Sequence, residues 1–145
     1  MSAFLSGRTE TLANVIAAWL VGAAIALGAF APAAAFGDDG KLYQVQDGNK
    51  VDKMTLEGWR TWRALACERC HGAQQQGLVG PSLLKSMQQL SREEFKNTVL
   101  KGRPEKGMPN FDGSHMVTEN IAGLYAYLKG RADGAIKPGR LEELK

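Results

Sequence analysis

Several marks of common protein classes are absent from this chain. No segment repeats itself, and no low-complexity block occurs beyond an alanine-rich stretch near the N-terminus. No paired carboxylates, Ser-His-Asp set or phosphate-binding loop indicates a catalytic centre. The charge is nearly balanced, with 18 Lys and Arg against 15 Asp and Glu and a net charge of +3. Such a mild excess is not typical of a nucleic-acid-binding protein, so no nucleic-acid partner is expected.

One long apolar run stands out near the N-terminus. Residues 12–30 are nearly all apolar and follow a short segment that carries Arg8, as in an export signal. Ala33 to Ala35 give the small-x-small pattern of a signal-peptidase site, which makes Phe36 the expected first residue of the mature protein. Ala31-Pro32-Ala33 is a weaker alternative site. We predict that residues 1–35 are a cleaved signal peptide and that the protein is periplasmic.

The alternative use of this run is an uncleaved membrane anchor, since about 20 apolar residues span a bilayer. In both cases the rest of the chain lies outside the cytoplasm. That compartment is oxidising, so two free thiols would close into a disulfide unless other chemistry consumed them.

The remainder of the chain divides into three parts. Residues 36–54 mix glycine, aspartate and lysine, and the Asp47-Gly48 pair indicates a turn, so a loop-like N-terminal extension is predicted there. The main domain is predicted over residues 55–131, and residues 132–145 form a C-terminal tail. No strand pattern competes with the helical patterns in the main domain.

Three helices are predicted within the main domain. The first begins at Thr55 as N-cap, and the second begins at Ser91, which forms a capping box with Glu94. The third follows Thr118 and ends at Gly130, with one apolar face formed by Ile121, Leu124, Tyr125 and Leu128. Three helices with long loops make a thin core, so a bound group is expected to fill the middle.

Cysteine is scarce, and its two copies fall within the run Cys67-Glu68-Arg69-Cys70-His71. This C-x-x-C-H pattern is the attachment motif of c-type haem. Two thiols three positions apart match the two vinyl groups of one porphyrin, to which they add as thioethers. His71 then supplies the proximal imidazole to the iron. The pattern predicts one covalently bound haem c, held by Cys67, Cys70 and His71.

Other uses of the two thiols are weaker. A structural zinc site needs four ligands, and His115 is the only histidine left to act as the fourth. A thioredoxin-like redox pair normally lies between a strand and a helix, a context that this sequence lacks. A plain structural disulfide also remains possible.

Two downstream segments suit the two sides of such a haem. The Gly80-Pro81-Ser82-Leu83 run places the Pro81 carbonyl where it can accept the second ring N–H of His71. Met108 lies in a predicted flexible loop and is the expected sixth iron ligand. The other candidates for the sixth ligand fit less well, since Met87 suits core packing, Met116 packing under the third helix, and His115 a solvated loop.

His and Met ligation leaves no open position on the iron for a substrate, and it raises the reduction potential. These ligands predict an electron-transfer protein and not an enzyme. A haem enzyme such as a peroxidase would need a vacant or labile sixth position.

The motifs of Cys67–His71, Gly80–Leu83 and Met108-Pro109 occur in the order found in class I cytochromes c, which residues 55–131 resemble. The resemblance implies an all-α fold of about three helices with long loops around one covalently attached haem. It also implies that the helix before Cys67 crosses the C-terminal helix, with Trp62 and Tyr125 as the expected contact. One departure is that Gly58, Trp62 and Cys67 are spaced with one extra residue before the cysteine.

The flanks DGNKVDKMTLEGWRTWRALACERCHG and LYAYLKGRADGAIKPGR resemble the small periplasmic cytochromes, including the cytochrome c-L group, that accept electrons from PQQ-dependent alcohol dehydrogenases. This resemblance implies a carrier that passes electrons to a terminal oxidase or another cytochrome. Because an electron shuttle can work as a monomer, a monomer is expected. Lys101, Arg103 and Lys106 are candidates to steer an acidic partner. The alternative function is a membrane-anchored haem subunit of a respiratory complex.

Overall fold

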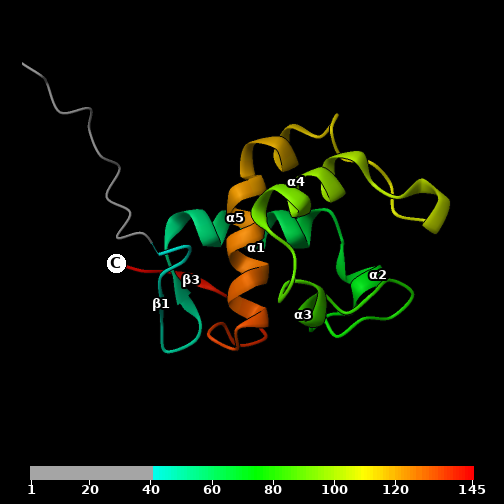
Figure 1. Cartoon of the computed structure of the whole chain (residues 1–145). Coiled ribbons are helices and arrows are strands. Elements are labelled where there is room, and N and C mark those ends of the chain that lie inside the picture. The colour runs from blue at the N-terminus through cyan, green and yellow to red at the C-terminus, as the bar shows by residue number, and fades with distance from the viewer. Residues whose placement is uncertain (1–40) are drawn as a thin grey trace, which may run out of the picture. The chain divides into compact units, whose positions relative to one another are not determined.

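The computed structural model describes residues 41–145, and the predicted signal peptide at residues 1–35 lies outside this range. The elements in chain order are β1 (Val45–Gln46), β2 (Lys50–Val51), α1 (Lys53–Ala64), α2 (Glu68–His71), α3 (Leu83–Ser86), α4 (Arg92–Lys101), the 3-10 turn η1 (Pro104–Lys106), α5 (His115–Ala132) and β3 (Glu142–Glu143) (Figure 1). The predicted all-α class is confirmed, because the described part is mainly helical. The three predicted helices correspond to α1, α4 and α5.

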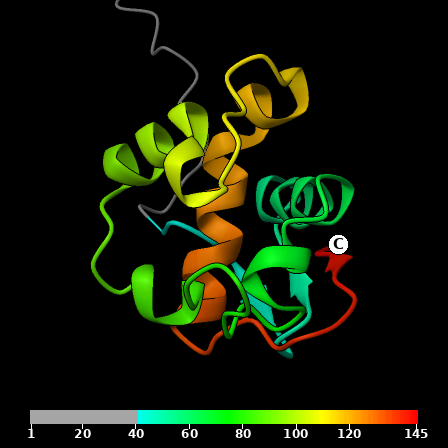
Figure 2. The same ribbon diagram turned by 90° about the vertical axis from the view of Figure 1, so that its right-hand side faces the viewer.

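The longest helix, α5, forms the centre of the fold. Figure 2 shows α5 in orange between α1 in teal and α4 in yellow-green. The crossing of α1 and α5 is a backbone contact between Gly58 and Gly123. A Cβ atom on Gly58 would lie 1.9 Å from the Gly123 oxygen, and one on Gly123 would lie 2.2 Å from the Met54 oxygen. Only glycine at both positions allows so close an approach.

The predicted contact between Trp62 and Tyr125 is wrong. The Trp62 ring lies 6.4 Å from the Tyr127 ring, whereas the Tyr125 ring lies 5.3 Å from Phe95 of α4. Positions 125 and 127 are about 200° apart around a helix with 3.6 residues per turn. They therefore face opposite neighbours, and Tyr127 is the residue turned towards α1.

The N-cap of α1 is Asp52 and not the predicted Thr55. The Asp52 carboxylate accepts the Thr55 backbone N–H at 2.9 Å and the Thr55 hydroxyl at 2.7 Å. It also accepts the backbone N–H of Gln44 at 2.7 Å. Asp52 is thus both the helix cap and the anchor of the N-terminal extension.

The two ends of α5 also differ from the prediction. The helix is capped by Ser114 and includes His115 and Thr118, and it continues past Gly130 to Ala132. Gly130 does not close the helix but lies within it, and a Cβ there would lie 2.6 Å from the buried Ile136 side chain. The chain leaves the helix later, after Asp133. For α4 the predicted capping box between Ser91 and Glu94 is confirmed in both directions.

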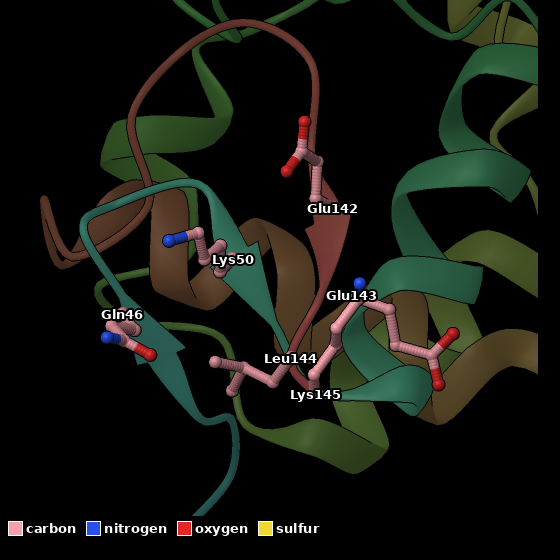
Figure 3. A pocket seen from close by; sticks show the side chains of 6 residues that line it. All are labelled: Gln46, Lys50, Glu142, Glu143, Leu144 and Lys145. Atoms are coloured by element: carbon pink, nitrogen blue, oxygen red, sulfur yellow. The ribbon is translucent and has the colours of Figure 1, made fainter.

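A small sheet joins the N-terminal extension to the C-terminal tail. β2 pairs antiparallel with β1 and parallel with β3, and Asp47 and Gly48 at the turn between β1 and β2 both have positive φ. The sequence predicted this turn, but it did not predict the sheet. An open pocket of about 320 Å³ lies along it, lined by Gln46, Lys50, Glu142, Glu143, Leu144 and Lys145. Figure 3 shows these six side chains.

The hydrophobic core extends beyond the predicted main domain. Val51 from the extension and Ile136 and Leu141 from the tail are buried together with Leu56, Leu124 and Leu128. The extension and tail therefore help to bury the helices. Within residues 41–145 no helix is both long and apolar enough to cross a membrane. The anchor alternative concerns residues 12–30, which lie outside the described range.

Candidate haem site

The turn between α1 and Cys67 accommodates the extra residue noted in the sequence. The Cys67 N–H donates to the Trp62 oxygen at 3.3 Å, and the Ala66 N–H donates to the Arg63 oxygen at 3.1 Å. These two bonds form a Schellman motif, in which the left-handed residue is usually glycine. Here Ala66 occupies that position with φ of +50°. The extra residue is thus taken up in the turn that ends α1.

The short helix α2 places the two thiols one turn apart. The backbone N–H groups of Cys70 and His71 both donate to the Cys67 oxygen, at 3.2 and 3.0 Å. Both cysteines are free thiols, with Cys67 half-buried and Cys70 exposed. Burial, with a smaller contribution from the Glu68 carboxylate, raises the pKa of the Cys67 thiol to about 11.

The predicted hydrogen bond to His71 is present. His71 Nδ1 lies 2.9 Å from the Pro81 oxygen. Because a carbonyl oxygen can only accept, Nδ1 carries the proton and Nε2 of the neutral ring has a free lone pair. This is the tautomer that a metal-ligating histidine needs.

The loop after His71 is fitted closely around the imidazole. The Gly77 N–H donates to the His71 oxygen and the Gly80 N–H donates to the Cys70 oxygen, each at 2.8 Å. A Cβ atom on Gly80 would lie 3.0 Å from His71 Cε1 and 3.1 Å from Nδ1. A side chain at position 80 would thus crowd the ring, which would have to shift by a few tenths of an ångström.

Met108 lies in a compact segment after α4 and not in a loose loop. The backbones of Arg103 and Met108 exchange two hydrogen bonds, of 2.8 and 3.1 Å, and Gly107 turns the chain between them with φ of +78°. Met108 itself is half-buried and packs against the hydrophobic core. In Figures 1 and 2 this yellow segment and α2 lie on the same side of the molecule.

The other candidate ligands have different surroundings. Met87 is fully buried in the core, as its apolar neighbours predicted. His115 is exposed, but it lies in the first turn of α5 and not in a loop, with its ring nitrogen 4.0 Å from Glu119. Met116, in the same turn, is exposed and does not pack under the helix. Within residues 41–145, no group of three His, Cys, Asp or Glu side chains clusters as a metal site.

Sequence reasoning missed two features beside the site. Gln75 and Arg131 are both buried, and the Arg131 Nε donates a hydrogen bond to the Gln75 side-chain oxygen. The second feature is a pair of exposed apolar side chains in the loop after His71, where Leu78 is 73% and Val79 83% exposed. The burial of Gln75 and Arg131 could not be read from the sequence, because neither lies in an apolar pattern. Gln75 also has a positive φ of +61°.

Comparisons with known proteins agree with this geometry. The family model described as cytochrome c oxidase, cbb3-type, subunit III matches residues 53–128. Cytochrome c-555 of Methylococcus capsulatus is 44% identical over 94 residues, which cover 64% of this chain and 75% of that protein. The chain belongs to the c-type cytochrome family.

Two further similarities extend this assignment. The cytochrome is 30% identical to cytochrome c-553I of Paracoccus denitrificans over 110 residues, which cover 71% of this chain and 48% of that one. The crystal structure of the c-type cytochrome XoxG from Methylobacterium extorquens AM1 matches with a TM-score of 0.64 and 34% identity, over 71% of this chain and 67% of that chain. The protein is a small class I c-type cytochrome, an electron-transfer protein and not an enzyme.

The residues around α2 fit a covalently bound haem. They provide two free thiols one helical turn apart, an imidazole whose Nδ1 is fixed by Pro81, and a glycine where any Cβ would press on that ring. Haem c is the cofactor that this family carries, and these groups are the ones that would hold it.

Proposed function

We propose that this cytochrome is a mono-haem, one-electron carrier of the periplasm that accepts electrons from a PQQ-dependent alcohol dehydrogenase. It passes them to a terminal oxidase or to another cytochrome. The observation that carries the proposal is the hydrogen bond from His71 Nδ1 to the Pro81 oxygen at 2.9 Å, directly beside the two free thiols. A bound haem supplies an iron that gains and loses one electron.

The chain's own groups have distinct roles in this proposal. Cys67 and Cys70 would form the two thioether links, and His71 Nε2 would ligate the iron. Pro81 fixes the imidazole tautomer and ring orientation. Met108 would provide the second axial ligand, a soft thioether that favours the reduced iron.

The proposed Met108 ligand can be tested by replacement with leucine, which is of similar size but has no sulfur. Met108→Leu should abolish the weak far-red absorption band that a thioether gives to oxidised haem and lower the reduction potential. Met87→Leu is the matched control, because Met87 is fully buried in the core, and it should keep both. A far-red band that survives in Met108→Leu would assign the sixth ligand to another residue.

The donor class rests on the flanking sequences that resemble the cytochrome c-L group. The exposed side chains near the site are consistent with brief docking of a partner protein. Leu78 and Val79 present apolar surface in the loop that supports His71. Lys101, Arg103 and Lys106 precede Met108 in the chain and carry positive charge that can steer an acidic partner.

The donor can be tested by mixing the oxidised holoprotein with purified PQQ-dependent alcohol dehydrogenase and its alcohol, and following haem reduction over a salt series. Reduction should be fast at low ionic strength and slow as salt screens the basic side chains. Lys106→Gln should reduce the rate and its salt dependence, whereas Lys145→Gln, on the tail beside the small sheet, should not.

Two results would count against this proposal. An intact haem spectrum without reduction by the dehydrogenase would remove the donor assignment. A mature protein whose N-terminus precedes residue 12 would favour the alternative of a membrane-anchored subunit. The similar proteins, each named as a cytochrome, favour the carrier.

A further inference from the structure

Arg131 is a buried cation whose hydrogen-bond partners among residues 41–145 are all uncharged. It is 8% exposed, and none of the ion pairs among residues 41–145 includes it. Its Nε donates to the Gln75 side-chain oxygen at 2.7 Å, and its two terminal nitrogens donate to the backbone oxygens of Ile136 and Gln74. Removing a guanidinium from water without a carboxylate partner costs free energy. These three hydrogen bonds offset part of that cost and fix the orientation of the guanidinium.

Gln75 connects this cation to the haem-side loop. Its side chain is 1% exposed, and its φ of +61° lies in the left-handed region that a non-glycine residue adopts only under constraint. Its side-chain nitrogen donates to the Tyr127 hydroxyl at 3.2 Å. Arg131 and Tyr127 therefore fix Gln75 from two positions on α5.

The Gln75 backbone in turn holds the residues that follow Pro81. Its oxygen accepts the N–H of Leu83 at 2.9 Å and that of Leu84 at 3.3 Å, and also the Ser82 hydroxyl at 3.4 Å. On the other side of Pro81, the Gly80 N–H bonds to the Cys70 oxygen at 2.8 Å. The Pro81 carbonyl is thus fixed from both sides, and one side leads back to Arg131.

We propose that Arg131 is a positioning residue for the axial histidine, acting through Gln75 and the Ser82–Leu83 segment on the hydrogen bond between His71 and Pro81. This inference rests on the proposed function, in which His71 ligates the haem iron. A strong bond from Nδ1–H to a carbonyl makes the imidazole a better electron donor and so stabilises the oxidised iron. Loosening the loop should therefore weaken this bond and raise the reduction potential.

The sign of the potential shift separates positioning from simple electrostatics. Loss of a buried positive charge near the iron would lower the reduction potential, because the oxidised state carries the extra positive charge. Arg131→Lys keeps the charge but loses the planar fork that serves three acceptors at once. Gln75→Asn leaves the Arg131 charge unchanged, and asparagine adopts positive φ more readily. Its shorter side chain no longer reaches Arg131 and Tyr127, so both hydrogen bonds are lost.

The experiment compares both variants with the wild type as holoproteins. Hydrogen exchange of the His71 Nδ1–H in the reduced protein should accelerate about tenfold in each variant, and the reduction potential should rise. Tyr125→Phe is the matched control, because it removes one hydrogen bond from α5 to the Leu90 oxygen on the opposite face. It should leave both readings at the wild-type values.

Failure of this inference is distinct from failure of the proposed function. If the wild-type holoprotein lacks the spectrum of a histidine-ligated haem, the proposed function itself is wrong. If that spectrum is intact but neither Arg131→Lys nor Gln75→Asn changes the Nδ1–H exchange or the potential, the network only stabilises the fold. A fall in potential in both variants would likewise contradict positioning by Arg131.

Discussion

Single residues at this site are constrained by backbone conformation as much as by side-chain chemistry. Ala66 adopts φ of +50° so that the chain can pass from α1 into Cys67. An L-residue with a Cβ is strained in this conformation, and glycine is not. Gly80 has the opposite constraint, because any side chain there would press on His71.

At the residue scale, Ala66→Gly should stabilise the cytochrome by about 1 kcal/mol, since it relieves the left-handed strain in the Schellman motif. Urea unfolding of the holoprotein measures the change. Ala64→Gly, at the last residue of α1, should instead not stabilise, because alanine is unstrained in a helical conformation and glycine has the lower helix propensity. If Ala66→Gly also lowers the free energy of unfolding, position 66 is not strained.

The elements are brought together mainly by the glycine crossing of α1 and α5. This contact fixes where α1 ends, and through the turn at Ala66 it fixes where α2 presents Cys67 and His71. The aromatic pair on this interface is Trp62 with Tyr127. The Trp62 ring also lies 6.3 Å from the His71 ring. The same side chain therefore packs against both α5 and the candidate iron ligand His71.

At the element scale, Gly123→Ala should destabilise the fold by at least about 1–3 kcal/mol, because its Cβ would lie 2.2 Å from the Met54 oxygen and the helices must separate. The midpoint of thermal unfolding, followed by circular dichroism, measures this loss. Gly113→Ala is the control, since a Cβ there meets nothing within 4 Å. Equal midpoints for the two variants would contradict the close crossing.

At the scale of the whole described structure, residues 41–145, the N-terminal extension contacts the end of α5. The Tyr43 hydroxyl donates to the Asp133 carboxylate at 2.8 Å, which Lys129 also contacts. Burial, followed by the Asp133 hydrogen bond and charge, raises the pKa of Tyr43 to about 12. Burial likewise raises the pKa of Tyr127 to about 12.

At the whole-molecule scale, these tyrosines predict a loss of stability at alkaline pH. A folded pKa of about 12, above the ordinary value of 10.0, means that folding favours the neutral phenol. The stabilisation is full below pH 10 and is lost as the pH rises towards 12. The free energy of unfolding, measured with urea between pH 9 and 12, should fall less steeply in Tyr43→Phe. An unchanged slope in this variant would exclude a contribution from Tyr43.

Much of the local structure could be predicted because its determinants are close in sequence. The capping box of Ser91 and Glu94 depends on residues three apart, and the bond from His71 to Pro81 on residues ten apart within one loop. The class of fold and the family followed from the same short motifs. Met108 as iron ligand stays a prediction, since only its segment and its surroundings are described.

The remaining features could not be read from local patterns, because they depend on pairs that are distant in the chain. Asp52 replaced Thr55 as the cap of α1 because its carboxylate also bonds to Gln44. Gly130 lies within α5, and its lack of a side chain leaves room for Ile136. Trp62 faces Tyr127 because of the rotation of α5, and the small sheet exists because the tail returns to the extension.

The sequence by itself determined the chemistry of this protein, since two thiols, an imidazole and a proline carbonyl are placed by short-range backbone geometry. The tertiary structure alone decided how firmly those groups are held. A buried arginine on α5 bonds to a glutamine in the haem-side loop, 56 positions earlier in the chain. Such a contact forms only when packing of the helices brings the two segments together and excludes the water that would otherwise satisfy both side chains.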